Sequence, residues 1–188
     1  SEKIKWVTKE IAPVLKELIN TSLQEGEFPS CFKLAKVVCI FKGKGDRKEK
    51  GSYRPVSNLP LFGKCIEVAV DMQLRNYCEK FNLFGMHQHG FRRSRSTATA
   101  VQTAVTNWRG KKAEGKFQAA LLFDLSAAYD LLDKELFLRK AELYGITGAA
   151  LRWLRSYLSE RSQVVQVNEA RSSIKMLEFG TPQGSSCS

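Results

Sequence analysis

The chain has 188 residues, 43% of them hydrophobic, which is enough to bury a core in one domain or in two closely packed subdomains. No apolar run is long enough to span a bilayer, and the N-terminus is too polar for a signal sequence. The five cysteines are scattered along the chain, which argues against a zinc site or a disulfide framework and for a reducing compartment. The net charge of +11 is concentrated in residues 31–64 and 91–116, with local charges of +7 and +6, which is typical of a polyanion-binding surface and also of a solvated basic face.

The first third of the chain predicts a long helix followed by a β-hairpin. Apolar residues recur at helical spacing over residues 4–25, where Pro13 is a candidate kink. Residues 34–41 are apolar and β-branched and predict a strand, and residues 53–59 predict a short return strand. A basic loop with several glycines, residues 42–51, connects the two strands.

The middle of the chain predicts two helices and a buried strand. Residues 61–81 and 97–108 carry apolar side chains on one side, with an irregular polar stretch, residues 85–96, between them. Residues 117–124 form an apolar run that ends in Asp124, and such a run is typical of a strand buried on both faces. Because an unpaired buried charge is very costly, this carboxylate is expected to meet a cation or a hydrogen-bond donor.

The last third predicts two helices and a second hairpin. Residues 133–143 form a helix that an aspartate can cap, and residues 149–158 form another. Residues 163–168 and 172–179 predict a two-stranded hairpin, and residues 184–186 would begin one more helix. Since helices and strands mix without regular βαβ alternation, the predicted fold class is α+β.

Asp124 is the candidate metal ligand of the chain. Phosphoryl transfer to a nucleotide uses Mg²⁺, a hard cation that binds carboxylate and phosphate oxygens. Taken alone, an aspartate after an apolar strand is more often a helix cap or a turn residue. Asp130 lies past the end of the predicted strand, so we expect it to make hydrogen bonds instead of pairing with Asp124 on a metal.

Four motifs follow one another along the chain. They are Tyr-Arg-Pro-Val-Ser at residues 53–57, Gln-His-Gly-Phe-Arg-Arg-Ser-Arg-Ser-Thr at 88–97, Phe-Asp-Leu-Ser-Ala-Ala-Tyr-Asp at 123–130 and Gly-Thr-Pro-Gln-Gly-Ser at 180–185. In this order they resemble the catalytic core of a reverse transcriptase of the kind encoded by non-LTR (LINE-like) retrotransposons. The resemblance covers about residues 34–188.

The resemblance implies part of the right-hand fold of a polymerase. Residues 1–30 would be a helical lead-in to the fingers, residues 31–116 the fingers, and residues 117–188 the first part of the palm. The fold class implied in this way is α+β, in agreement with the mixture of predicted elements.

The resemblance also implies a nucleotide site. Asp124 would bind metal, and Lys42 and Arg54 would bind the triphosphate through charge-assisted hydrogen bonds. Tyr129 would lie beneath the sugar of the incoming nucleotide and reject ribonucleotides by steric clash. Gln183 would contact the base pair with an amide that both donates and accepts. Taken alone, the residues favour a core aromatic residue for Tyr129 and an exposed hairpin for Arg54.

A nucleic-acid surface is implied by two of the motifs. Arg92, Arg93 and Arg95 would contact the template backbone, because arginines beside a helix N-terminus suit phosphates. Gly184 would allow the backbone to approach the nucleic acid closely.

The chain departs from the family pattern in ways that affect activity. Ala127 stands where the family commonly has a polar residue, and Ser52 replaces an asparagine. The aromatic-x-Asp-Asp motif that supplies the other metal-binding acids does not occur, since the sequence contains no Asp-Asp pair. A two-metal site needs several carboxylates, so we expect this chain to be an inactive fragment. The complete protein would extend a DNA primer on an RNA template, with dNTPs and two Mg²⁺ ions.

Two alternatives stay open at this point. The chain could be a non-catalytic remnant that binds RNA or primer–template, or it could come from a group II intron or retron-type reverse transcriptase. The resemblance implies an intracellular ribonucleoprotein, nuclear or cytoplasmic, without a membrane partner. The sequence does not indicate protein partners.

Overall fold

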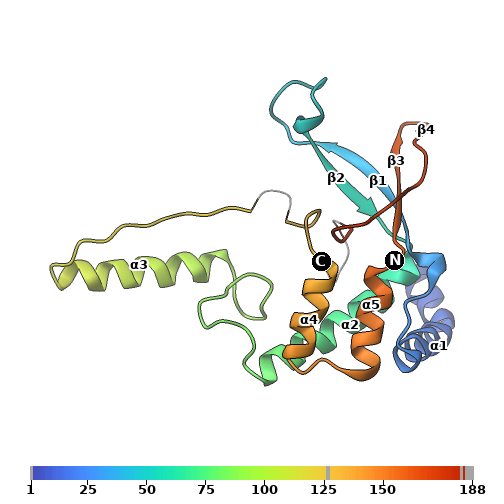
Figure 1. Cartoon of the computed structure of the whole chain (residues 1–188), viewed down its shortest axis with the longest axis horizontal. Coiled ribbons are helices and arrows are strands. Elements are labelled where there is room, and N and C mark those ends of the chain that lie inside the picture. The colour runs from blue at the N-terminus through green and yellow to red at the C-terminus, as the bar shows by residue number, and fades with distance from the viewer. Residues whose placement is uncertain (1, 126–127, 183, 185–188) are drawn as a thin grey trace. The chain divides into compact units, whose positions relative to one another are not determined.

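The computed structural model of the chain describes every residue except 1, 126–127, 183 and 185–188 (Figure 1). The protein divides into two compact units, the first made of Ser1–Met72 and Ala127–Ser188 and the second of Gln73–Ser126. The helices and 3-10 turns are α1 (Glu2–Glu25), η1 (Ser30–Phe32), η2 (Lys50–Ser52), α2 (Leu61–Lys80), α3 (Thr97–Ala113), α4 (Lys134–Leu143) and α5 (Gly148–Leu158). The strands are β1 (Leu34–Phe41), β2 (Tyr53–Asn58), β3 (Ser162–Val167), β4 (Ala170–Arg171) and β5 (Lys175–Met176). These elements confirm the α+β fold class.

The strands of the described residues form one sheet in the first unit. Their order is β2-β1-β3-β4, and β5 also pairs with β3. β1 and β2 are antiparallel, with Phe41 opposite Tyr53, which confirms the predicted hairpin. β1 also runs parallel to β3, with Val37 opposite Val165, and this long-range pairing joins the hairpin to the last third of the chain.

The predicted strand at residues 172–179 forms only in part: Lys175 and Met176 pair antiparallel with β3, as the predicted hairpin requires, but the rest of the stretch is not a strand. Only β4 and β5, of two residues each, pair with β3 in this region. Between them, the Ser172 hydroxyl accepts a hydrogen bond from the Val165 N–H at 3.0 Å and donates to the Ser173 carbonyl at 2.8 Å. Because this side chain takes the place of a backbone partner, the regular ladder is interrupted.

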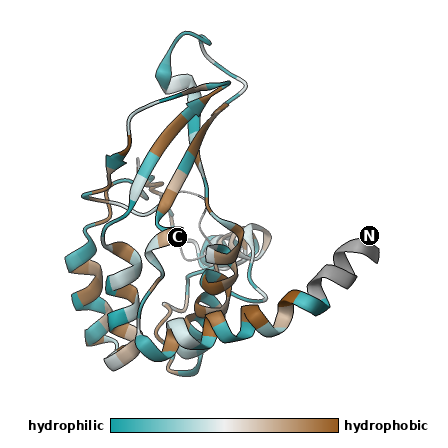
Figure 2. Ribbon diagram, turned by 90° about the vertical axis from the view of Figure 1, so that its right-hand side faces the viewer, coloured by the Kyte–Doolittle hydropathy of each residue, from teal (hydrophilic) through white to brown (hydrophobic). Residues whose placement is uncertain are grey.

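The helices of the first unit lie where helical spacing predicts them. α1 continues through Pro13 as one helix. α4 begins after Asp133, whose side chain accepts a hydrogen bond from the Leu136 N–H at 2.9 Å, so the predicted cap is confirmed. Both apolar and polar residues occur along the helices (Figure 2), as expected of helices that bury one side. In the hairpin, β1 is apolar from Val37 to Phe41, whereas β2 carries mostly polar residues.

The core of the first unit contains an aromatic cluster. Trp153 and Tyr157 of α5 stack with their ring centroids 5.2 Å apart, and Phe28, which follows α1, packs edge-on against both. The Tyr157 hydroxyl donates to the buried Glu67 carboxylate of α2 at 3.2 Å. The buried Arg161 guanidinium lies 4.6 Å from the centre of the Tyr157 ring. Since Arg161 directly precedes β3, the cluster fixes the helices to the sheet that carries the hairpin.

In the second unit, the predicted buried strand at residues 117–124 is wrong. Residues 116–125, which we call the apolar segment, have no regular secondary structure, and Leu122 and Phe123 are 93% and 88% exposed. A strand is stable only when neighbouring strands take up its backbone hydrogen bonds. The strands of the described residues all belong to the first unit, so none pairs with this segment.

α3 begins as predicted, but its apolar side is not buried. The Ser96 side chain accepts a hydrogen bond from the Thr99 N–H at 3.3 Å, and the Thr99 hydroxyl accepts one from the Ser96 N–H at 2.9 Å. This reciprocal capping box starts the helix. Val101 and Trp108, expected to face inward, are about half exposed, and none of the α3 residues is buried. The expected inward face of this helix is therefore wrong.

Two expectations from composition can be compared with the described residues. None of the described helices is long and apolar enough to cross a membrane. Cys31, Cys39, Cys65 and Cys78 are all free thiols. The division into fingers and palm stays a prediction, since the two compact units do not identify polymerase subdomains.

Candidate nucleotide and nucleic-acid interface

Lys42 and Arg54 lie at the same end of the β1–β2 hairpin. Ile40 is directly opposite Arg54, and Lys42 follows Ile40 by two residues. Because side chains alternate between the two faces of a strand, Ile40, Lys42 and Arg54 share one face. Both cationic side chains are exposed. The hairpin therefore presents an ammonium and a guanidinium on one face, and two such cations can bind a polyphosphate.

The loop that joins the two strands is held by local contacts. The Lys42 N–H donates to the Ser52 carbonyl at 2.8 Å, and the Lys42 ammonium donates to the Gly51 carbonyl at 2.7 Å. Gly45 has φ +90°, and a Cβ there would lie 2.6 Å from the Ser52 hydroxyl. The Tyr53 hydroxyl donates to the Arg47 carbonyl at 2.9 Å. These contacts order the tip of the hairpin without using the Arg54 guanidinium.

The segment around Gly180 and Thr181, which with Gly184 we call the glycine turn, packs against the turn that contains Tyr129. The Thr181 N–H donates to the Tyr129 carbonyl at 2.8 Å, and the Gly180 N–H donates to the Leu132 carbonyl at 2.9 Å. Gly180 has φ +79°, and a Cβ there would lie 2.6 Å from the Tyr129 carbonyl oxygen. Only glycine fits this approach. The sequence motif contained Gly180, but the contact with Tyr129 joins residues far apart in sequence and was not predicted.

The same glycine turn also approaches the hairpin. Gly184 has φ +109°, and a Cβ there would lie 3.1 Å from the Ser57 carbonyl oxygen of β2. The structure therefore brings Tyr129, Gly184 and the strand of Arg54 together. Gln183, predicted to contact the base pair, lies outside the described residues.

A cavity of about 250 Å³ lies between this turn and the sheet. Its polar lining includes Ser57, Asp130, Gln163 and Thr181. Thr181 is 9% exposed, and its hydroxyl has no hydrogen-bond partner among the described residues. Buried hydroxyls are normally hydrogen-bonded, so this oxygen is available to a water molecule or a ligand.

Asp124 lies in the second unit, within the apolar segment. Its neighbours Phe123 and Leu125 are 88% and 80% exposed, and Asp124 itself is exposed. No group of three or more histidine, cysteine, aspartate or glutamate side chains that could hold a metal ion occurs among the described residues. A single carboxylate has the right oxygen donors for Mg²⁺ but is too little for a two-metal site.

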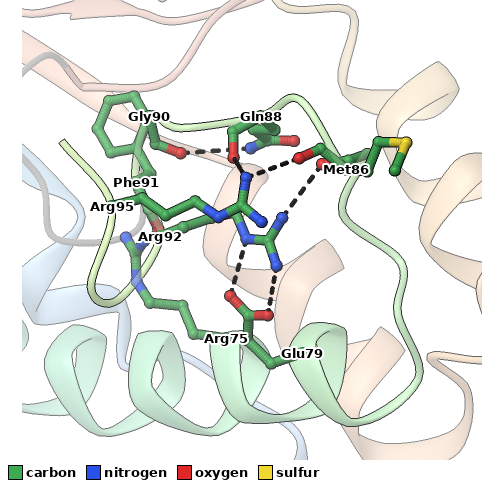
Figure 3. A network of polar contacts seen from close by, with 9 residues as sticks. Arg75, Glu79, Met86, Gln88, Gly90, Phe91, Arg92 and Arg95 are labelled. Carbon is green, nitrogen blue, oxygen red and sulfur yellow. Dashed lines mark hydrogen bonds and ion pairs between the residues drawn. The ribbon is translucent and has the colours of Figure 1, made fainter. Parts of the chain in front are cut away.

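Arg92 is used inside the second unit. Its Nε and Nη2 donate to the two oxygens of Glu79 on α2 at 2.9 and 2.7 Å, and its Nη1 donates to the Gly85 carbonyl at 3.1 Å (Figure 3). The hydrogen bond from Arg92 holds the pKa of Glu79 below its ordinary value, and the same bond raises the pKa of Arg92. This bidentate pair ties residues 84–96, which we call the arginine loop, to the end of α2.

Arg95 and Arg75 hold the backbone of the arginine loop. Arg95 donates to the Met86 carbonyl at 2.6 Å and to the Gln88 carbonyl at 3.3 Å, and Arg75 of α2 donates to the Phe91 carbonyl (Figure 3). Arg93, by contrast, is exposed and makes no hydrogen bond or ion pair within the described part of the chain. Sequence reasoning missed Arg75 and Glu79, although their spacing of four residues places both on one side of the predicted helix.

The hairpin, the glycine turn and the arginine loop carry three of the four motifs that resemble a reverse transcriptase. Comparison with known families gives the same class: residues 43–188 match the family described as reverse transcriptase (RNA-dependent DNA polymerase). The chain therefore belongs to the reverse transcriptase family.

Relatives of the chain are proteins of insect mobile elements. It is 31% identical over 175 residues to the RNA-directed DNA polymerase from mobile element jockey and 28% identical over 174 residues to the probable RNA-directed DNA polymerase from transposon BS, both of Drosophila melanogaster. A putative 115 kDa protein in the type-1 retrotransposable element R1DM of the same species is 28% identical over 187 residues. These matches cover 89%, 89% and 96% of the chain but 18%, 18% and 17% of the relatives. They confirm the resemblance to reverse transcriptases of non-LTR retrotransposons, of which the chain spans a small part.

Proposed function

We propose that this chain is part of an RNA-directed DNA polymerase of a non-LTR retrotransposon. The complete protein would extend a DNA primer on an RNA template with dNTPs. The observation that carries the proposal is the strand register that places Lys42 and Arg54 on one face at the end of the hairpin. A dNTP carries its charge on three phosphates, and a guanidinium beside an ammonium offers bidentate and point-charge contacts to them.

Tyr129 and Gly184 would complete the nucleotide side of the site. Gly180 lies against the Tyr129 backbone and Gly184 against β2. Tyr129, held there, would lie against the sugar and exclude a 2′-hydroxyl by clash. Gln183 would contact the base pair.

Asp124 would supply one carboxylate to Mg²⁺ in the complete protein. Two Mg²⁺ ions, when bound, would stabilise the attacking and leaving oxygens of the phosphoryl transfer. The described residues do not assemble the remaining ligands, so we assign no step of the reaction to them. The protein is further proposed to act in an intracellular ribonucleoprotein, nuclear or cytoplasmic, without a membrane partner.

Primer extension tests the proposal. A longer polypeptide from the source transcript that contains this chain should add dNTPs to a DNA primer on an RNA template. Asp124→Asn should abolish addition, and Arg54→Gln should raise the KM for dNTP more than Arg54→Lys. The exposed Arg139 of α4 provides a matched control, since Arg139→Gln removes the same charge at a distance in sequence from every motif. Full extension by the Asp124→Asn protein would contradict the assignment.

A non-catalytic remnant is the second candidate function, because no described group of side chains can hold a metal ion. It predicts salt-dependent binding of RNA by the chain without dNTP addition by any longer polypeptide from the same transcript. Recovery of the element's own RNA with a tagged protein from cells would support the ribonucleoprotein in either case.

A further inference from the structure

The cavity between the glycine turn and the sheet, which we call the Asp130 cavity, is the right size for a small ligand. Its volume of about 250 Å³ is several times the roughly 30 Å³ that one water molecule occupies in the liquid. It is smaller than the pockets of roughly 300–1,000 Å³ that hold drug-sized ligands. All of its lining residues belong to the first unit, so one compact body forms the whole site. The size allows a small molecule or a single side chain as occupant.

The charge of the Asp130 cavity is opposite to that of the chain. The chain carries 30 Lys and Arg residues against 19 Asp and Glu residues, yet Asp130 is the one charged side chain among the described residues that line the cavity. Its carboxylate is exposed and forms no hydrogen bond or ion pair with another described residue. The nearest cation along the chain, Lys134, donates instead to the Leu177 carbonyl at 2.5 Å. The cavity therefore favours a positively charged ligand over an anion.

Two hydroxyls and an amide supply further oxygen acceptors. Thr181 is 9% exposed, and its hydroxyl has no hydrogen-bond partner among the described residues. The buried Ser57 hydroxyl and the Gln163 side chain also line the cavity. Because buried hydroxyls are rarely left without a partner, the Thr181 oxygen indicates an occupant that can form hydrogen bonds. A ligand with several N–H donors would bind Thr181 and Asp130 at once.

The Asp130 cavity is distinct from the proposed triphosphate site. Val37 of β1 pairs with Ser57 of β2, and both line the cavity. Arg54 precedes Ser57 on the same strand by an odd number of residues, so side-chain alternation places the two on opposite faces of the sheet. Lys42 shares the face of Arg54, and neither cation lines the cavity. Since Asp130 would also repel a phosphate, a dNTP is not the ligand of this cavity.

We propose that the Asp130 cavity binds a planar nitrogen cation, a guanidinium or an amidinium. Asp130 would accept two parallel N–H bonds from such a group, and the Thr181 hydroxyl would accept a third. Phe179, which is 62% exposed and lines the cavity, offers a ring on which a planar cation can stack. A primary ammonium has the same charge without the planar pair of donors, so it should bind less tightly. The inference does not depend on the proposed function.

Titration of the isotope-labelled 188-residue chain with benzamidine, followed by NMR chemical shifts, tests the proposal. Benzamidine should bind saturably and shift the amides of Ser57 and Thr181. Benzylamine should bind less tightly, and benzoate, with the opposite charge, should not bind. Asp130→Asn should weaken benzamidine binding about tenfold or more and Thr181→Val about fivefold, while Thr181→Ser should bind like the unmodified chain. Asp46→Asn and Thr103→Val, exposed and outside the cavity, are matched controls that should not change the affinity.

Failure of this inference is distinguishable from failure of the proposed function. If benzamidine causes no saturable shifts at the two amides, the cavity holds only water and the inference is wrong. Equal affinities of Asp130→Asn and Asp46→Asn would contradict it as well. In both cases the proposed function stands, because Lys42 and Arg54 take no part in the cavity. Thermal unfolding of Asp130→Asn and Thr181→Val should match that of the unmodified chain, since neither side chain is bonded to another described residue.

Two sources can supply a cation of this kind: a free small molecule, or an arginine side chain in another part of the longer protein. The chain spans only 18% of the jockey and BS relatives, so much of the complete protein lies outside it. The same titration of a longer polypeptide from the source transcript distinguishes the two sources. If an arginine occupies the cavity there, benzamidine should no longer bind, and Asp130→Asn should lower the unfolding temperature of the longer polypeptide only. If the ligand is free, benzamidine should bind both polypeptides equally.

Discussion

The aromatic cluster of the first unit and the apolar segment of the second are similar in composition and opposite in structure. Trp153 and Tyr157 are 1% and 2% exposed, whereas Leu122 and Phe123 are almost fully exposed. The cluster is enclosed by α2, α5 and the chain around Phe28, each of which offers an apolar side to the others. Among the described residues of its own unit, Trp108 and Lys112 of α3 line a cavity with the first residues of the apolar segment, but none of these side chains is buried. The difference shows that an apolar run is buried by its partners and not by its composition.

The largest expected effect is the difference in free energy of unfolding between substitutions in the aromatic cluster and in the apolar segment. Trp153→Ala should destabilise the chain by about 3–5 kcal/mol, because it leaves a large cavity and removes the ring against which Phe28 and Tyr157 pack. Leu122→Ala should change the free energy of unfolding by less than about 0.5 kcal/mol, because no buried contact is lost. Urea denaturation followed by tryptophan fluorescence and circular dichroism measures both. Comparable losses would show that the apolar segment has a packing partner.

A smaller effect is expected from two glycines with similar backbone conformations. Gly180→Ala should cost about 2 kcal/mol, since the new Cβ would lie 2.6 Å from one carbonyl oxygen and 2.8 Å from another as well as being strained by φ +79°. Gly115, beside the apolar segment, has φ +72° and nothing within 4 Å. Gly115→Ala should therefore cost only the backbone strain, about 1 kcal/mol. If both substitutions had the same cost in urea denaturation, the close approach of Gly180 to Tyr129 would be wrong.

Local signals in the sequence were sufficient for most elements. β1 was predicted at residues 34–41 from β-branched residues, and α4 from the capping side chain of Asp133, because both signals act within a few residues. The prediction of a strand at residues 117–124 was wrong because its signal was not local. A strand buried on both faces depends on neighbours that no local pattern specifies. The parallel pairing of β1 with β3 was missed for the same reason, since it joins residues more than a hundred positions apart.

In the candidate site, too, features that depend on local sequence were predicted and contacts between distant elements were not. Lys42 and Arg54 were identified from a motif, and their shared face follows from strand alternation once the hairpin register is known. The approach of Gly180 to Tyr129 and the bond between Arg92 and Glu79 are contacts between elements, so the sequence alone could not predict them. The three arginines of the loop looked equivalent as a motif. Only the structure distinguishes the exposed Arg93 from Arg92, which binds Glu79 of α2 and the Gly85 carbonyl, and from Arg95, which binds the Met86 carbonyl.

Removing the N-cap side chain of a helix in each unit should cost about 1 kcal/mol of helix stability. The two units should differ in how this loss is observed. Asp133→Ala removes a hydrogen bond to the Leu136 N–H of α4, and α4 buries Leu138 and Ala141, so the loss should appear in the global unfolding of the first unit. Ser96→Ala removes the cap of α3, which buries none of its residues. Its effect should appear as faster amide hydrogen exchange in α3, with urea denaturation of the first unit unchanged. A global loss of stability in Ser96→Ala would show that α3 is part of the main cooperative unit.

The smallest expected effect is a loss of hydrogen-exchange protection in the arginine loop at low pH. The apolar segment of the same unit should show no such loss. Arg92 lowers the pKa of Glu79, so the stability that this carboxylate gives the loop is present above the ordinary glutamate pKa of about 4.3 and is lost as the pH falls through the lowered value. Hydrogen exchange of residues 84–96, corrected for the intrinsic rate, should therefore lose protection below about pH 4, whereas the apolar segment should be unprotected throughout. Glu79→Gln should remove this pH dependence. Glu114→Gln is the matched control, because hydrogen bonds from Lys116 and Lys111 lower the pKa of Glu114 in the same unit but outside the loop. If the Glu79→Gln loop kept the pH dependence of the unmodified loop, a different acidic side chain would have to stabilise the loop. Arg92 would then be available to contact a phosphate.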